Sequence, residues 1–258
     1  MMRTRLLILS AFSLSLSSPG FGQNAPGAKA AAPIDLTGYW VTVITPDWRE
    51  RMVAPAKGDY LAVPITAAAQ KVADAWDPAK DEAEGNACRA YGAVGVMQRP
   101  GRLHITWADD NAMKIEADAG TQTRLLHFGA VPADRGAATW QGYSTAQWMV
   151  NGRAVLDLGG IGVIRGGGPS GPTKGGSLKA VTTNMRPGYI RKNGVPYSAG
   201  AVLTEYFNRV TGANGDIYIA VTAMLEDQAY LTQPFVRTYQ FKQQADGTGW
   251  DPTPCLTR

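Results

Sequence analysis

The sequence predicts an all-β protein, an antiparallel barrel or sandwich that is lipocalin-like in the broad sense and has one short helix. Short runs of alternating or β-branched residues recur along the chain, and Gly, Pro, Asn and Asp separate them. This is the pattern of strands joined by turns. The runs number about nine or ten, enough for a closed barrel or two packed sheets.

The first strand is expected at residues 39–44 (YWVTVI), after a turn at residues 35–38. The helix is expected at residues 66–76, with Thr66 as its N-cap and Asp77-Pro78 as its end. Its expected apolar face consists of Ala69, Val72, Ala73 and Trp76. The other strands are expected at residues 102–107, 112–117, 121–128, 146–150, 178–183, 202–210, 217–225 and 235–242.

The glycine-rich segment at residues 158–176 interrupts this order and is unsuited to a strand interior. We expect a long loop there, and we favour a tolerated insertion over a lid.

The two ends of the chain predict an exported protein with a single folded domain. Residues 1–22 combine Arg3 and Arg5 with a short apolar run and a small-residue exit, as a secretory signal peptide does. Residues 23–34 are expected to be a disordered linker, and residues 35–258 a single β-barrel domain. No later run approaches ~20 apolar residues, so we expect a periplasmic or secreted protein without a membrane span.

Charge and cysteine content narrow the classes further. The net charge of +4 includes the two signal-peptide arginines, and the basic residues are scattered, so a nucleic-acid partner is not expected. Cys88 and Cys255 are the only cysteines, and in an oxidising compartment we expect them to form a disulfide. The sequence does not determine the oligomeric state.

Several segments together are similar to a known family. They are DLTGYW at 35–40, RPGRLHITW at 99–107, DAGTQTRLLHF at 118–128, WQGYSTAQW at 140–148, LKAVTTNMRPGY at 178–189, LTEYFNRV at 203–210 and LEDQAYLTQPF at 225–235, with a closing PTPC at 252–255. The chain resembles a family of secreted or periplasmic bacterial β-rich proteins with the pattern TGxW, GxSxxW, LxVxTTN and TExFxR. The resemblance implies fold and location and carries no activity. The glycine-rich segment replaces the short link that the family has there.

Strand parity assigns the candidate site residues to faces, because alternate residues of a strand point to opposite sides. His104 lies opposite the apolar Leu103 and Ile105, so we expect it to face solvent. His127 and Arg124 belong to one strand and point to opposite faces of it. The face of His127 also carries Thr121, Thr123 and Leu125, and this mixture of polar and apolar residues could line a cavity. We expect His127 inside the barrel as a general acid or base, or else as a structural histidine.

The strand at residues 202–210 places Glu205 on one face with Phe207 and Arg209. A carboxylate on an apolar face predicts a charge pair inside the barrel, or a partner that orients His127. Arginines and tyrosines elsewhere are candidates for binding an anionic group or an aromatic ring. The substrate-binding candidates are Arg124, Tyr206, Arg209, Arg237, Tyr189 and Arg191.

The functional hypothesis is a periplasmic enzyme without a cofactor, a lyase, isomerase or hydrolase that acts on a small organic or sugar-derived substrate. His127 and Glu205 are its predicted catalytic residues. The chain has no GxSxG or HExxH motif, and two histidines cannot form a three-histidine zinc site, so no metal or organic cofactor is expected. The alternatives are a lipocalin-like binding protein for a hydrophobic or aromatic ligand and a structural partner in an envelope complex.

Overall fold

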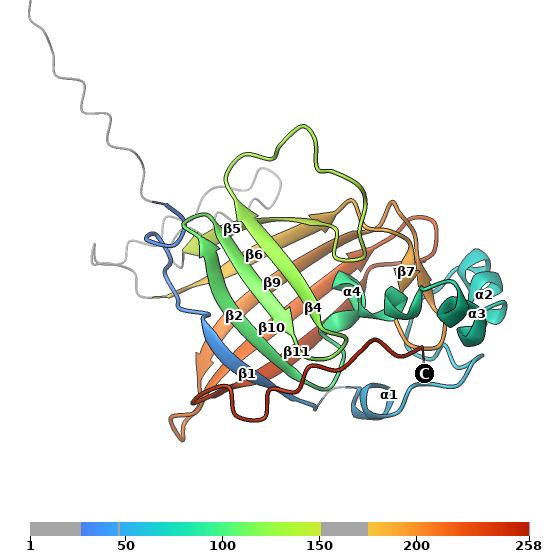
Figure 1. Cartoon of the computed structure of the whole chain (residues 1–258), viewed down its shortest axis with the longest axis horizontal. Helices are drawn as coiled ribbons and strands as arrows, with labels where there is room; N and C mark the ends of the chain where they lie inside the picture. Colours follow the sequence, from blue (N-terminus) through green and yellow to red (C-terminus); the bar gives the residue numbers. More distant parts are fainter. Residues whose placement is uncertain (1–26, 46, 151–174, 258) are drawn as a thin grey trace, which may run out of the picture.

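The protein folds around a closed barrel of nine strands, seen in a computed structural model that describes residues 27–45, 47–150 and 175–257. The strands follow one another around the barrel in the order β1-β11-β10-β9-β6-β5-β4-β3-β2 (Figure 1). They are β1 Gly38–Val43, β2 Arg102–Asp109, β3 Ala112–Ala117, β4 Gln122–Phe128, β5 Tyr143–Val150, β6 Gly176–Thr183, β9 Val202–Thr211, β10 Ile217–Glu226 and β11 Phe235–Gln244. A separate two-stranded sheet consists of β7 Gly188–Tyr189 and β8 Pro196–Tyr197. The predicted all-β barrel is confirmed.

The barrel contains one parallel pair of strands. Strand directions that alternate around a barrel close only when the number of strands is even, so nine strands leave one pair parallel. That pair is β4 and β5, with Leu126 opposite Ser144 and Phe128 opposite Ala146. Residues 129–142 carry the chain back along the barrel between them, as a parallel connection requires.

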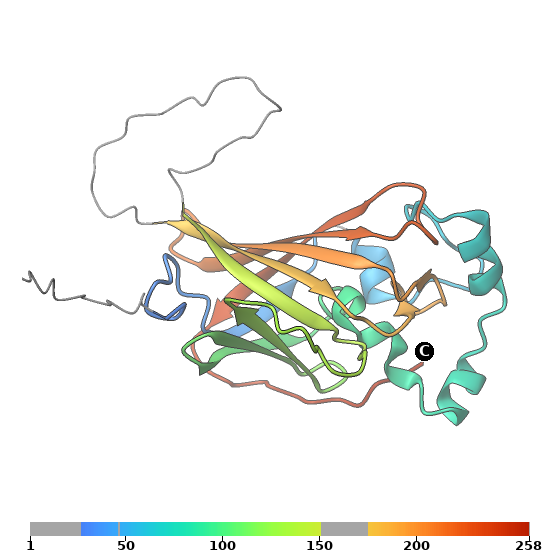
Figure 2. The ribbon, with the colours of Figure 1, turned by 90° about the horizontal axis from the view of Figure 1, so that it is seen from above.

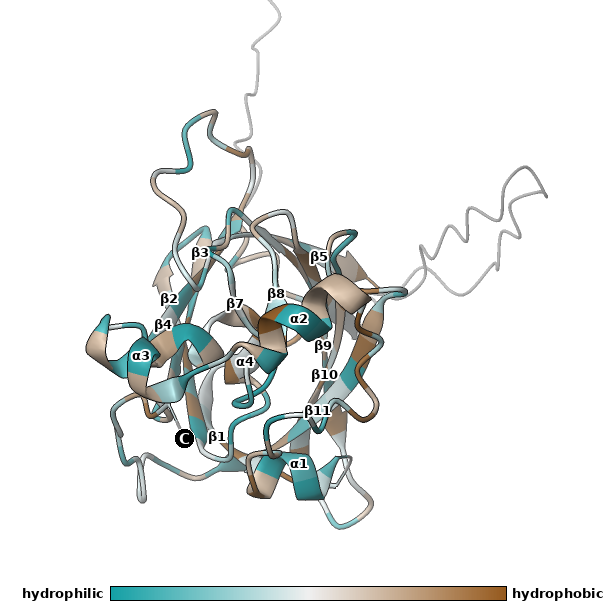
Figure 3. Ribbon diagram, turned by 90° about the vertical axis from the view of Figure 1, so that its right-hand side faces the viewer, coloured by the Kyte–Doolittle hydropathy of each residue, from teal (hydrophilic) through white to brown (hydrophobic). Residues whose placement is uncertain are grey.

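Short helices gather at one end of the barrel, which we call the helical end (Figure 3). They are α1 Trp48–Met52, α2 Ala67–Asp74, α3 Pro78–Ala83, the 3₁₀ helix η1 Ala87–Tyr91 and α4 Ala93–Val96. The predicted helix corresponds to α2, and Thr66 caps it by accepting a hydrogen bond from the Ala69 amide at 3.2 Å. α2 ends at Asp74, two residues before the predicted end. Asp77 instead caps α3 by accepting from Ala79 N–H, where a loop was predicted.

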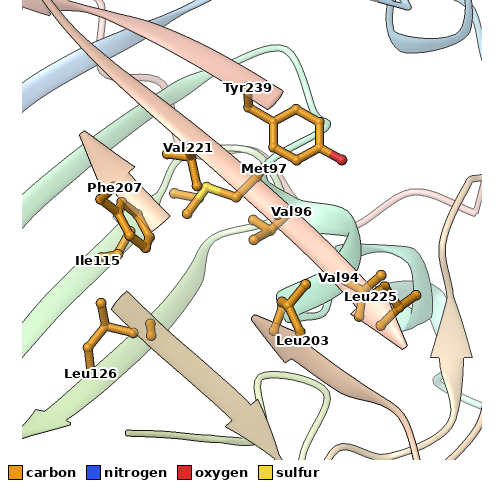
Figure 4. Packing of buried hydrophobic residues seen from close by; sticks show 14 of the residues in the cluster. Val94, Val96, Met97, Ile115, Leu126, Leu203, Phe207, Val221, Leu225 and Tyr239 are labelled. Atoms are coloured by element: carbon orange, nitrogen blue, oxygen red, sulfur yellow. The ribbon is translucent and has the colours of Figure 1, made fainter. Parts of the chain in front are cut away.

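Helix α4 and the residue after it close the barrel at the helical end. Val94, Val96 and Met97 are buried in one apolar core with side chains from the strands (Figure 4). Gly95 allows α4 to lie close against η1, because a Cβ at this position would lie 2.1 Å from the Ala90 carbonyl oxygen. The interior of the barrel is therefore a packed core.

The opposite end of the barrel is closed by residues 27–34, which were predicted to belong to a disordered linker. The Trp148 indole donates to the Ala28 carbonyl at 2.8 Å, and the Lys29 amide donates to Asp110 O at 3.0 Å. Residues 28 and 29 of the predicted linker therefore contact β5 and the turn between β2 and β3. The signal peptide, residues 23–26 of the linker and nearly all of the glycine-rich segment lie outside the described residues.

A C-terminal segment returns along the outside of the barrel to the helical end (Figure 2). The predicted disulfide between Cys88 and Cys255 is present and joins this segment to η1. Hydrogen bonds hold the segment on both sides of the bridge, from Thr253 N–H to Asp118 O at 2.9 Å and from Leu256 N–H to Tyr91 Oη at 3.3 Å.

A charge pair is buried inside the barrel between β4 and β9. Arg124 Nη2 lies 2.6 Å from Glu205 Oε2, Arg124 Nη1 lies 3.2 Å from Glu205 Oε1, and both side chains are almost fully buried. The hydroxyl of Thr182 accepts a further bond from Arg124 Nη2 at 3.2 Å and shares one with Ser144 at 2.7 Å. The sequence predicted a charge pair at Glu205, but the partner is Arg124, because Arg209 lies exposed near the end of its strand.

Removing one member of this pair should destabilise the fold strongly. We expect Glu205→Leu to lower the free energy of unfolding by about 3–5 kcal/mol, because the Arg124 guanidinium remains buried without a counter-charge. The double variant Arg124→Met/Glu205→Leu should recover most of that loss. Urea unfolding of the three proteins checks this, and a double variant no more stable than the single one would contradict it.

Candidate functional site: a basic pocket at the helical end

The two predicted catalytic residues lie on opposite sides of the barrel wall. His127 stacks on Tyr143 on the outer face, with ring centroids 4.8 Å apart, and Glu205 is fully buried in the interior with Arg124. β4 pairs with β3 in continuous register from Gln122 to His127, so the side chains at 124 and 127 must point to opposite faces. The predicted pairing of His127 with Glu205 is therefore not formed.

The predicted substrate-binding residues also separate into several places. Arg124 belongs to the closed interior, Arg209 is exposed, and Tyr206 lies beneath Lys179, whose Nζ is 5.7 Å from the ring centroid. These three share no site with one another. Tyr189 and Arg191 belong to the helical end, at β7 and just after it.

Tyr189 belongs to a hydrogen-bonded cluster around a buried carboxylate. Asp81 accepts from Arg89 Nη1 at 2.7 Å, from the Tyr189 hydroxyl at 2.9 Å and from the Trp76 indole at 3.1 Å. Burial, together with the bond to Asp81, raises the pKa of Tyr189 to about 12. Because the carboxylate is satisfied by these three donors, the cluster holds α3 against β7 and has no acid free for chemistry.

A second group at the helical end contains two buried arginines without a carboxylate partner among the described residues. Arg51 of α1 and Arg99, which follows α4, line a pocket of ≈ 320 Å³ together with Tyr91, Lys192 and Thr253. The pocket lies between α1 and the C-terminal segment, and its described lining includes no histidine or carboxylate. We call it the basic pocket.

The two pocket arginines are buried, yet part of their hydrogen-bonding capacity is unused. Arg99 is 8% exposed, and within the described chain its one hydrogen bond runs from Nε to Gly95 O at 3.4 Å. Arg51 donates from Nε to Gln98 O at 3.1 Å and from Nη2 to Thr42 Oγ1 at 2.9 Å. Its Nη1 is buried and has no partner among the described residues. Neither guanidinium forms an ion pair there.

The electrostatics of the pocket reflect burial of positive charge. Burial lowers the pKa of Arg99 to about 10, and Arg51 and Arg191 lower it too, against opposing effects of Tyr91 and Tyr239. Burial likewise lowers the pKa of Arg51 and the pKa of Arg191. At neutral pH all three arginines are still protonated, so the pocket holds charge that burial disfavours.

The carboxylates that act on these arginines do not balance their charge. Asp47 acts on both Arg51 and Arg191, and Glu50 acts on Arg191, but Asp47 is already paired with Arg237. Four arginines thus face two carboxylates, an excess of two positive charges in the group Arg51, Arg99, Arg191, Arg237, Asp47 and Glu50.

Sequence reasoning found Arg191 and Arg237 near this site and missed Arg51 and Arg99. The signal for Arg99 is the short apolar run AVGVM followed directly by Gln98, Arg99 and a proline. A run of this length is too short to show helical periodicity. Only its insertion into the barrel makes the following arginine a pocket residue.

Comparisons with protein-family models, curated proteins and solved structures found no match. The resemblance to the family of secreted β-rich proteins therefore stays a prediction. Within the described residues, no helix has the length and apolar character needed to cross a membrane. The same residues contain no group of three or more His, Cys, Asp or Glu side chains that could hold a metal ion.

Replacing Arg99 should distinguish a binding arginine from a structural one. We expect Arg99→Met to raise the free energy of unfolding of the ligand-free protein, on the order of 1–3 kcal/mol, because an uncompensated buried charge is removed. Chemical unfolding in a buffer with chloride as the only anion measures this. Arg209→Met, which removes an exposed charge, serves as control and should change little; a loss of stability in Arg99→Met would contradict the interpretation.

Proposed function

We propose that this protein binds a small anionic ligand, one with a carboxylate, phosphate or sulfate group, in the basic pocket. The single observation that carries the proposal is the pair of buried guanidinium groups, Arg51 and Arg99, with unused donors and no ion-pair partner among the described residues. A buried cation without a partner is costly. An anion that accepts from both guanidinium groups offsets that cost and gains charge-assisted hydrogen bonds.

The surroundings of the pocket favour an oxyanion over a neutral ligand. Lys192 adds a third cationic side chain to the lining, and Tyr91 and Thr253 add neutral polar side chains. The volume of ≈ 320 Å³ is at the lower end of the range of small-molecule sites. Titratable groups with shifted pKa values, such as Arg99 here, are frequent at functional sites.

Binding is favoured over acid–base catalysis because of what lines the pocket. Its described lining offers arginines, a lysine and a tyrosine but neither histidine nor carboxylate, and the predicted His127–Glu205 pair is not formed. A lyase, isomerase or hydrolase of the kind expected from the sequence would need another acid or base. A hydrophobic ligand inside the barrel is also disfavoured, since the packed core fills the interior.

The proposed binding would take place outside the cytoplasm. The disulfide between Cys88 and Cys255 is compatible with an oxidising compartment. Together with the predicted signal peptide, it supports a role in the periplasm or outside the cell.

Sulfate should stabilise the protein through the pocket. At a sulfate concentration one hundred times the dissociation constant, we expect the free energy of unfolding to rise by about 2.7 kcal/mol. Arg99→Met should abolish this gain, and Arg209→Met should keep it. Chemical unfolding with and without sulfate, at constant ionic strength, makes the comparison; equal gains in the two variants would exclude the pocket as the site.

The affinity for sulfate should fall at high pH. Arg99 binds the anion only when it is protonated. The affinity for sulfate is therefore at its full value well below the Arg99 pKa of about 10, and it falls as the pH rises through that value. Calorimetric titration with sulfate from pH 7 to pH 11 should show about a tenfold weakening per pH unit above about 10.

The groups that face Arg99 are Tyr91, Tyr239, Arg51, Arg191 and Lys192. The same decline is expected in Lys192→Met, which removes the lysine of the lining and keeps Arg99. A pH profile that stays flat to pH 11 in both proteins would show that Arg99 does not hold the anion.

A further inference from the structure

Three large apolar side chains beside the basic pocket are exposed. Trp48 is 64% exposed, Met52 59% and Val53 67%. Trp48 and Met52 are four residues apart in α1 and therefore lie on one face of the helix. We call Trp48, Met52 and Val53 the apolar rim.

The apolar rim and the basic pocket share a border. Met52 belongs to both, since it also lines the pocket next to Arg51. The hydropathy colours of Figure 3 show apolar and hydrophilic residues side by side on α1 at the mouth of the barrel. One edge of the molecule therefore offers exposed apolar surface directly next to buried positive charge.

Basic side chains continue around this edge. Arg49 and Lys57 are exposed, and Lys57 Nζ donates to Trp76 O at 2.9 Å. Glu50 is the one carboxylate within α1. Glu50 and Asp59 lie with Arg49 and Val53 around a neighbouring pocket. The excess of positive charge at this edge therefore comes from the basic pocket, and this excess is complementary to an anionic surface.

We propose that this edge docks on an anionic phospholipid bilayer, with a lipid phosphate in the basic pocket and the apolar rim at the boundary of the acyl chains. The inference rests on the proposed anion site and names the source of the anion. Tryptophan is favoured at the membrane interface, and clustered Lys and Arg are attracted to anionic lipids. α1 spans only five residues, so docking needs the pocket and the rim together.

The position of the rim relative to the pocket is fixed by the same arginine that serves the pocket. Arg51 binds Gln98 O and Thr42 Oγ1, two points of the barrel, and so holds α1 in place. A headgroup held in the basic pocket lies next to Met52, which lines the pocket and also belongs to the apolar rim. A small soluble anion would fill the pocket and leave the apolar rim exposed.

Vesicle co-sedimentation tests the proposal. The full-length mature chain is mixed with vesicles of phosphatidylcholine alone, or with 30% phosphatidylglycerol, and binding is expected only to the second kind. Trp48→Ser/Val53→Ser should weaken vesicle binding at least about tenfold and keep the stabilisation by sulfate. Leu125→Ser, on the outer face of β4, is the matched control and should bind vesicles normally.

The outcomes separate the two proposals. If sulfate stabilises the protein but the anionic vesicles do not bind it, docking is wrong and the anion site stands. If sulfate has no effect, the anion site itself fails. Normal vesicle binding by Trp48→Ser/Val53→Ser would overturn the role of the rim, and loss of a concentration-dependent dimer in that variant would assign the rim to a second copy of the chain instead.

Discussion

Insertion of residues 93–97 into the mouth of the barrel is the contact on which the rest of the structure depends. It fills the space that a hollow barrel would offer to a ligand, with Val94, Val96 and Met97 in the core. It also sets the position of Gln98, whose Nε2 donates to Ile190 O at 2.8 Å and whose carbonyl accepts from Arg51. The loop after β7, helix α1 and the start of β2 are thereby fixed to one short segment. The proposed ligand site then lies at the closed mouth of the barrel and not in its interior.

The protein buries two kinds of arginine, and the contrast between them supports the functional interpretation. Arg124 is paired with Glu205 through two contacts and bonded to Thr182, so its charge is balanced even though its Nε has no partner among the described residues. Arg99 is buried to a similar extent and has only one long bond to a carbonyl. Stability alone does not account for a residue of the second kind, since an apolar side chain of equal length would cost less. Residues that are unfavourable for stability in this way are expected at functional sites.

Much of the fold could be predicted from the sequence, because strand parity and turn residues are local. Leu103 and Ile105 are buried and His104 lies on the opposite face, as expected. Parity also required Arg124 and His127 to face opposite sides, but it could not decide which of them points inward. That depends on the neighbouring strands, where Glu205 supplies the counter-charge. The basic pocket could not be predicted, because Arg51 and Arg99 meet only through the insertion of a four-residue helix.

Arg51 links the anion site to the helix that carries the apolar rim. Its Nε and Nη2 hold α1 against Gln98 and Thr42, and its Nη1 points to no partner among the described residues. In the proposed complex, an anion in the pocket that Arg51 lines is attracted to the same guanidinium, so it favours the position of α1 in which these two bonds are made. By linkage, whatever fixes α1 through Trp48 and Met52 must strengthen anion binding by the same factor. The pocket and the rim are in this sense one site, in which charge and apolar surface act through a single side chain.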